Sequence, residues 1–240
     1  GMGALALTDL SNVFGLVKFY QAARKEGVKP IIGADVWITN PQERDKPYRL
    51  LLLVKDQQGY LNLCELLTKA SLGNQYRGRP EVEMEWLKDL SSGLIALSGA
   101  RHGDVGHALL TSAKDEALER ARTWQSIFPN AYYIEVQRAG HPQDEAHLHE
   151  AVHLACELNL PVVATHPIQF MSPEDYTAHE ARVCIAEGEV LANPKRLKKF
   201  TAHQYFKTQE EMQQLFSDLP AALTNSVEIA KRCNLTLILG

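Results

Sequence analysis

Short apolar stretches alternate with amphipathic stretches along most of this 240-residue chain. Strand-like stretches cover 4–8, 30–38, 50–54, 94–97, 132–136, 161–164 and 236–239. Helical spacing of apolar residues covers 13–25, 59–71, 83–90, 114–128, 144–158, 173–186, 209–215 and 220–233. Strands that alternate with helices favour a mostly parallel sheet, open or closed into a barrel, and we expect the barrel. The sequence therefore predicts an α/β protein.

The pattern continues without a repeat, a low-complexity tract or a Pro/Ser-rich linker, so we expect one domain over residues 1–240. The polar, glycine-containing segment 73–81 is expected to be a loop. Gly1 leads almost directly into a strand-like stretch and Gly240 directly follows one, which indicates an excised fragment.

Composition limits the class of protein. Apolar runs such as Leu50 to Val54 are far shorter than the roughly 20 residues of a membrane helix, so we expect a soluble protein. The chain shows no signal-peptide pattern, and its four cysteines lack CxxC spacing, which favours the cytoplasm. A net charge of −4 disfavours a tight DNA clamp. The basic segments 77–79 and 194–199 are interpreted as solvated surface, with contact to DNA or protein as the alternative.

Candidate ligands follow several predicted strands, at the end where barrels bind ligands. They are Asp9 (next to an unexpectedly apolar Leu10), Asp35, the 99–104 loop, Glu135 with Gln137, and Thr165 with His166. Carboxylates and imidazoles there could bind a divalent metal. Three of these residues also have a structural interpretation: Asp9 could cap the following helix, Glu135 could pair with an arginine, and His166 could be a turn residue.

Other motifs give little support to specific chemistry. His149 and His153 share a helix face near His147, but the glutamate of the HExxH pattern is missing, so we expect an exposed polar face. The chain contains no GxGxxG after a strand, no GxxxxGK[ST] and no GxSxG. Nucleotide-loop and serine-hydrolase functions therefore lose their best sequence support.

Seven stretches, in order along nearly the whole chain, carry a family resemblance. They are ALALTDLSNVFGLVKFY (4–20), GVKPIIGAD (27–35), LLLVKDQQGYLNL (51–63), GLIALSGARHGD (93–104), YIEVQR (133–138), LPVVAT (160–165) and NSVEIAKRC (225–233). They resemble the polymerase and histidinol phosphatase (PHP) domain of bacterial DNA polymerase III alpha subunits. This resemblance implies a distorted, seven-stranded, TIM-like β/α barrel whose first strand, with a His-x-His pair, would precede Gly1. In intact members the barrel mouth holds up to three zinc, manganese or magnesium ions and hydrolyses phosphoesters, including in 3′–5′ exonuclease proofreading.

The family's ligand positions are largely lost from this chain. At four ligand positions the family's histidine or aspartate is replaced, by Leu10, Arg49, Pro167 and Gln169. At two further ligand positions the chain keeps a carboxylate, Asp35 and Glu135. The resemblance therefore implies a vestigial metal site, including Asp9 and His166, with no bound metal and no catalytic residue. If a metal is bound, Asp35, Glu135 and His166 are the expected ligands. We hypothesise that Arg49 neutralises one of the remaining carboxylates, so that an ion pair replaces the metal.

Two functions of different classes follow from the resemblance. The first is a non-catalytic scaffold within a DNA-directed DNA polymerase, docking the epsilon proofreading exonuclease and the remainder of the alpha chain, whose palm would follow residue 240. In that case the domain itself binds DNA weakly or not at all. The alternative is a residual divalent-metal-dependent phosphoesterase, pyrophosphatase or 3′–5′ exonuclease using Asp9, Asp35, Glu135 and His166. A free-standing phosphoesterase is disfavoured by the lost ligands.

Overall fold

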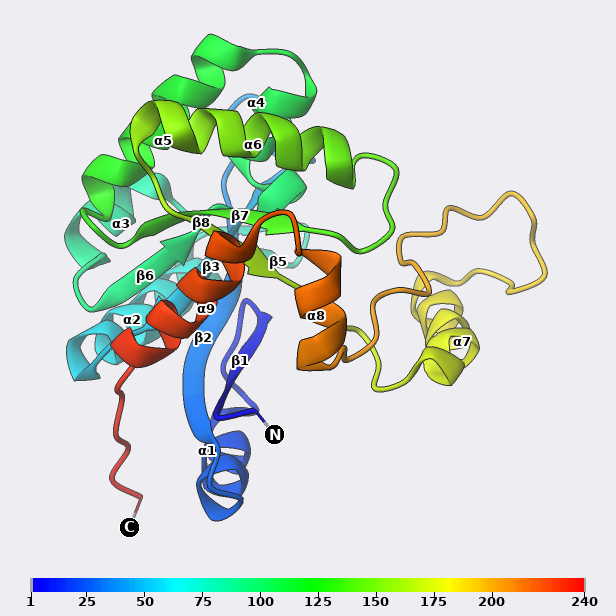
Figure 1. Ribbon diagram of the computed structural model, residues 1–240, viewed down its shortest axis with the longest axis horizontal. Helices are drawn as coiled ribbons and strands as arrows, with labels where there is room; N and C mark the ends of the chain where they lie inside the picture. The colour runs from blue at the N-terminus through cyan, green and yellow to red at the C-terminus, as the bar shows by residue number, and fades with distance from the viewer. Residues whose placement is uncertain (1, 240) are drawn as a thin grey trace.

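The computed structural model describes residues 2–239, and its helices surround a mixed β-sheet (Figure 1). The strands are β1 (Ala4–Leu10), β2 (Lys29–Ile38), β3 (Tyr48–Val54), β4 (Gln75–Tyr76), β5 (Arg79–Val82), β6 (Leu94–Leu97), β7 (Tyr132–Gln137) and β8 (Val162–Thr165). The α-helices are α1 (Leu16–Lys25), α2 (Gln57–Gly73), α3 (Met84–Leu90), α4 (Asp104–Leu110), α5 (Lys114–Ile127), α6 (Asp144–Leu158), α7 (Tyr176–Glu187), α8 (Gln209–Leu215) and α9 (Pro220–Arg232). Short 3₁₀ turns cover Ala100–His102 and Pro173–Asp175.

The eight described strands form one sheet in the order β4-β5-β2-β3-β6-β7-β8, and β1 pairs with β2. The long strand β2 pairs in parallel with β1 along 29–35 and with β5 at 37–38, so both lie on the same edge of β2. On its other edge lies β3, which is antiparallel to both β2 and β6. The predicted α/β class is confirmed, and the sheet is mixed because β3 returns through a loop and not through a helix.

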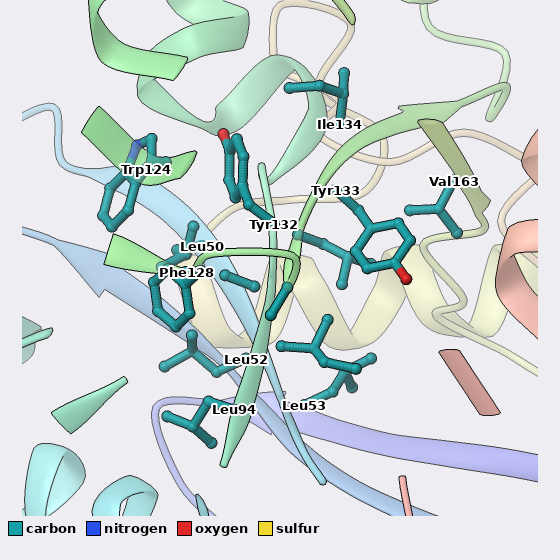
Figure 2. Packing of buried hydrophobic residues seen from close by; sticks show 14 of the residues in the cluster. Leu50, Leu52, Leu53, Leu94, Trp124, Phe128, Tyr132, Tyr133, Ile134 and Val163 are labelled. Atoms are coloured by element: carbon teal, nitrogen blue, oxygen red, sulfur yellow. The ribbon is translucent and has the colours of Figure 1, made fainter. Parts of the chain in front are cut away.

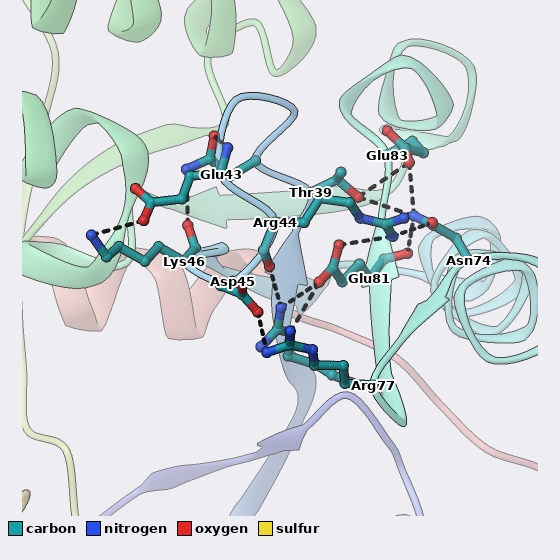
Figure 3. A network of polar contacts seen from close by, with 11 residues as sticks. Thr39, Glu43, Arg44, Asp45, Lys46, Asn74, Arg77, Glu81 and Glu83 are labelled. Atoms are coloured by element: carbon teal, nitrogen blue, oxygen red, sulfur yellow. Dashed lines mark hydrogen bonds and ion pairs between the residues drawn. The ribbon is translucent and has the colours of Figure 1, made fainter.

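The segment 73–81 was expected to be a loop, and this prediction is wrong, because it holds the hairpin β4–β5. Arg77 and Gly78 both have positive φ angles, 53° and 77°, as a two-residue hairpin turn requires. Arg77 pairs with Asp45 at 2.6 Å, and Arg79 pairs with the fully buried Glu81 at 2.7 Å (Figure 3). Two arginines of this basic segment are therefore paired with acidic side chains of the same chain.

Two further segments differ from expectation. Residues 104–110 form the helix α4, which the sequence pattern did not predict. Residues 236–239 form no strand, although their apolar sequence predicted one. Backbone N–H groups near this end donate to other acceptors, Asn234 to the Lys55 carbonyl at 2.7 Å and Leu237 to the Tyr20 hydroxyl at 3.2 Å. No neighbouring strand edge takes up residues 236–239, so the apolar sequence alone does not make a strand there.

Helices α4, α5 and α6 gather on one side of the sheet, and α9 packs against β8 (Figure 1). The core beneath them joins aliphatic strand residues such as Leu50 and Leu52 to the aromatic rings of Trp124, Phe128 and Tyr132 (Figure 2). The Trp124 ring centroid lies 6.3 Å from that of Phe128 and 6.4 Å from that of Tyr132. Burial of these large side chains fixes α5 against the sheet.

Residues 166–207, which we term the α7 lobe, extend to one side of the molecule (Figure 1). The lobe begins with a 3₁₀ turn whose Ser172 and Asp175 form a capping box, and α7 follows it. Six large apolar side chains of the lobe are exposed: Ile168, Met171, Ile185, Val190, Leu191 and Leu197. Over residues 2–239 we found no helix with the length and apolar character needed to cross a membrane.

Candidate functional site

The pairing register places several predicted site residues on one face of the sheet. Leu10 lies opposite Asp35, which in turn lies opposite Leu51. Arg49 and Leu51 share a face because side chains alternate along a strand. Through the pairs Leu51–Leu97 and Leu97–Tyr133, the same face continues to Glu135 and then to Thr165 on β8. We call this surface, defined by Leu10, Asp35, Arg49, Glu135 and Thr165, the site face.

Arg49 and Asp35 form a two-point ion pair on the site face. The Arg49 Nε donates to Asp35 Oδ1 at 2.8 Å, and a second guanidinium nitrogen donates to Oδ2. The Arg49 guanidinium carbon also lies 4.5 Å from the centroid of the Trp37 ring. Burial raises the pKa of Asp35 above its usual value, while the hydrogen bonds and charge of Arg49 act in the opposite direction. Arg49 thus neutralises Asp35, one of the two carboxylates considered from the sequence.

Glu135 is 3% exposed and has only neutral donors around it. The Gly99 N–H donates to its Oε2 at 3.0 Å, and the Gln137 amide and the Thr165 hydroxyl donate to its Oε1, the former at 3.1 Å. Burial raises the pKa of Glu135, opposed by the Thr165 hydrogen bond. The arginine partner considered for Glu135 is absent from residues 2–239, where no ion pair involves this carboxylate.

Gly99 brings its amide to Glu135 through a left-handed conformation. Its φ is +75°, and a Cβ at this position would lie 2.3 Å from the Arg49 carbonyl oxygen. A side chain here would therefore collide with the β3 backbone. The sequence signal was the glycine two residues after the end of β6, but only the structure shows which carboxylate its N–H group meets.

Asp9 does not join the site face. It lies within β1 opposite Ala34, and a Cβ placed on Gly15 would lie 3.3 Å from its Oδ2, so its carboxylate faces α1. The interpretation of Asp9 as a helix cap is also wrong, because α1 begins at Leu16 after Gly15 and has no side-chain cap. Leu10, 42% exposed, occupies the site face beside Asp35.

The first residues of the α7 lobe, directly after β8, are hydrogen-bonded to residues near its other end. His166 Nε2 donates to the His203 carbonyl at 2.8 Å, and burial lowers the pKa of His166. The Pro167 carbonyl accepts from the Gln204 side chain at 2.9 Å, and the Gln169 N–H donates to the Gln204 carbonyl at 2.8 Å. These three predicted site positions therefore join the two ends of the α7 lobe, and the Gln169 side chain is exposed.

The residues of the site face do not fit a divalent metal cluster. Both Asp35 oxygens accept from Arg49, and both Glu135 oxygens accept from neutral donors. A divalent ion about 4 Å from the guanidinium would be repelled by about 8 kcal/mol at an effective dielectric constant near 20. Within residues 2–239, no three histidine, cysteine, aspartate or glutamate side chains gather in a group that could hold a metal ion.

Sequence reasoning missed the role of Trp37, whose ring supports the Arg49 guanidinium. The available signal was the alternation of β2, because a residue two places after Asp35 shares its face. Thr165 and Gln137 were noted as strand-end residues, but their joint hydrogen bonds to Glu135 depend on the β7–β8 register.

Comparison with known proteins agrees with the resemblance found in the sequence. The PHP domain family model matches residues 1–139, a stretch that includes Leu10, Asp35, Arg49 and Glu135. The DNA polymerase III subunit alpha of Pseudomonas aeruginosa is 48% identical to this chain. The match covers 100% of this chain and 20% of that relative. The corresponding subunits of Neisseria meningitidis serogroup A and Escherichia coli K12 are 52% and 44% identical, again over 100% of this chain and 21% of each relative.

The chain thus spans about a fifth of the length of the curated relatives it matches. The match to their sequences runs through every segment that forms the site face, from β1 to β8. Together, the family model and the continuous similarity show that this chain belongs to the PHP domain family.

Proposed function

We propose that this chain is the PHP domain of a replicative DNA polymerase alpha subunit and acts without catalysis, as a scaffold and as a docking site for the epsilon proofreading exonuclease. The proposal places it in the bacterial cytoplasm, as one domain over residues 1–240. The Arg49–Asp35 ion pair is the observation that carries it. A guanidinium bound to Asp35, which keeps a carboxylate at an expected ligand position, leaves no unpaired charge at that position, so the domain keeps its fold without the hydrolytic centre.

The exposed apolar residues of the α7 lobe support a docking role. Ile185 is 82% exposed, Leu197 is 76% exposed and Val190 is 67% exposed. Several strongly exposed large apolar side chains within one short segment are typical of a surface that contacts another protein. Full burial of each side chain would contribute roughly 1.5–3 kcal/mol, enough for a few such residues to dominate an interface. We place the epsilon contact here.

Binding of purified epsilon to this chain, measured by isothermal titration calorimetry, tests the docking role. Ile185→Asp and Leu197→Asp are each expected to weaken binding at least tenfold without changing the melting temperature. Leu72→Asp is the matched control, because Leu72 is 85% exposed on α2 of the main body. Absence of binding by the unmodified chain, or equal loss in the control, would contradict the proposal.

A residual metallohydrolase remains the alternative function, since Asp35 and Glu135 share one face of the sheet. Manganese titration with pyrophosphate and p-nitrophenyl phosphate, followed by phosphate release, separates the two functions. We expect no turnover above the uncatalysed rate. Saturable turnover that Glu135→Ala abolishes would show that the site face is catalytic and would overturn the non-catalytic assignment.

A further inference from the structure

A concave site lies at the start of β3, where Tyr48 lines it. It is a hollow of about 260 Å³ between the loop joining β2 to β3 and the turn that follows β6. Its lining includes Lys46, Tyr48, Arg101, His102 and His107. Tyr48 precedes Arg49 in β3, so the two side chains point to opposite faces. Arg49 and Asp35 do not line the hollow, although the Arg49 charge lies close enough to help lower the pKa of the His102 imidazole.

Arg101 is the least satisfied cation at this hollow. Its side chain is 21% exposed, and its nearest acidic atom is Asp144 Oδ1, 3.8 Å from Nε. Asp144 uses its other oxygen to accept from the N–H groups of Ala139 and His141, at 2.7 and 2.9 Å. The Arg101 guanidinium donates no hydrogen bond to any residue in the described range 2–239. Largely buried cations are normally hydrogen-bonded, so the five N–H groups of Arg101 lack their expected acceptors.

Further donors surround the same hollow. The rings of His102 and His107 make no hydrogen bond to residues 2–239, and the His107 ring centroid lies 5.9 Å from that of Tyr48. The Lys46 ammonium, 71% exposed, lies 2.9 Å from Glu43 (Figure 3), which leaves two of its three N–H donors without a protein acceptor. Glu43 also lines the hollow and offsets the Lys46 charge, so Arg101 and the two imidazoles are the main donors there.

We propose that this hollow binds a phosphate group, carried by a phosphomonoester or a diphosphate. A planar guanidinium can donate two parallel hydrogen bonds to phosphate oxygens, and the imidazole and ammonium donors can reach the remaining oxygens. The volume of about 260 Å³ lies just below the roughly 300–1,000 Å³ of typical small-ligand pockets, which suits a phosphate or diphosphate group. The nearby carboxylate of Asp144 offsets part of the Arg101 charge and favours modest affinity.

Titration of the chain with inorganic pyrophosphate tests this site, with calorimetry for affinity and imidazole C2–H proton resonances for location. We expect saturable binding that shifts the His102 and His107 resonances. Thymidine monophosphate should produce the same shifts and thymidine none, because the phosphate group is the recognised element. Arg101→Gln is expected to weaken binding at least tenfold.

Matched variants decide the location independently of folding. Arg77→Gln is the control, since Arg77 is an exposed arginine paired with Asp45 on the β4–β5 hairpin, and it should leave the affinity unchanged. If Arg101→Gln lowers the melting temperature, His102→Gln provides the second test and should weaken binding severalfold. A lack of saturable binding would overturn the proposal, and so would an affinity in both Arg101→Gln and His102→Gln equal to that of the unmodified chain. Loss of binding in Arg49→Met alone would also overturn it, because that result would place the anion on the site face.

Discussion

Replacing Arg49 by leucine isolates the contribution of the ion pair on the site face. The variant leaves the Asp35 carboxylate in a site where its side chain is only 26% exposed, and it also removes the contact with Trp37. Exposed ion pairs contribute about 0–1 kcal/mol, whereas removing one partner of a buried pair costs about 3–5 kcal/mol. With both side chains about a quarter exposed, we expect a loss of about 2–3 kcal/mol at pH 8.

The pH dependence of that loss has a defined sign. Burial already raises the pKa of Asp35, and without Arg49 the opposing effect disappears, so the pKa rises further. A carboxyl group with a raised pKa stabilises the fold when protonated, and this contribution is lost as pH rises through the folded-state pKa. The penalty of Arg49→Leu should therefore be smaller at pH 4.5 than at pH 8.

Urea unfolding of the unmodified chain and of the variant at both pH values measures this effect, which corresponds to about 5–10 °C in melting temperature at pH 8. The double variant Asp35→Leu/Arg49→Leu should recover most of the stability, because no buried charge is left unpaired. Arg77→Leu serves as the control for an exposed pair and should cost at most about 1 kcal/mol. A penalty below about 0.5 kcal/mol at pH 8, or one that grows on acidification, would refute the reasoning.

Two other perturbations test separate parts of the fold. Burial lowers the pKa of His147 to about 4 from its usual 6.5, so its stabilising contribution is present above pH 6.5 and is lost as pH falls toward 4. His147→Gln should remove up to about 3 kcal/mol of this acid sensitivity in unfolding measured from pH 7 to pH 4, and an unchanged pH profile would contradict the assignment. In α2, a Cβ on Gly59 would lie 1.9 Å from the Gly93 carbonyl oxygen, so Gly59→Ala should cost at least about 2 kcal/mol in urea unfolding. A Cβ on Gly73, in the same helix, would have no atom within 4 Å, so Gly73→Ala should change the free energy of unfolding by less than about 1 kcal/mol. Similar costs for Gly59→Ala and Gly73→Ala would contradict this packing.

Sequence periodicity located most long elements within two or three residues of their observed ends, because apolar spacing directly reflects which side of an element is buried. It missed the β4–β5 hairpin, whose strands are only two and four residues long and depend on the paired Arg79 and Glu81. It also predicted a strand at 236–239, where the apolar sequence finds no strand edge. Short elements depend on tertiary partners more than on their own pattern.

By itself, the sequence determined which chemical groups stand at the positions that the resemblance assigns to metal ligands. Leucine at position 10 and arginine at 49 are incompatible with imidazole ligation wherever the backbone places them. Only the tertiary structure decided that Arg49 pairs with Asp35, that Asp9 faces α1, and that Glu135 is surrounded by neutral donors. The physical reason is register: alternation within one strand fixes which residues share a side, but pairing between strands fixes which of those residues meet.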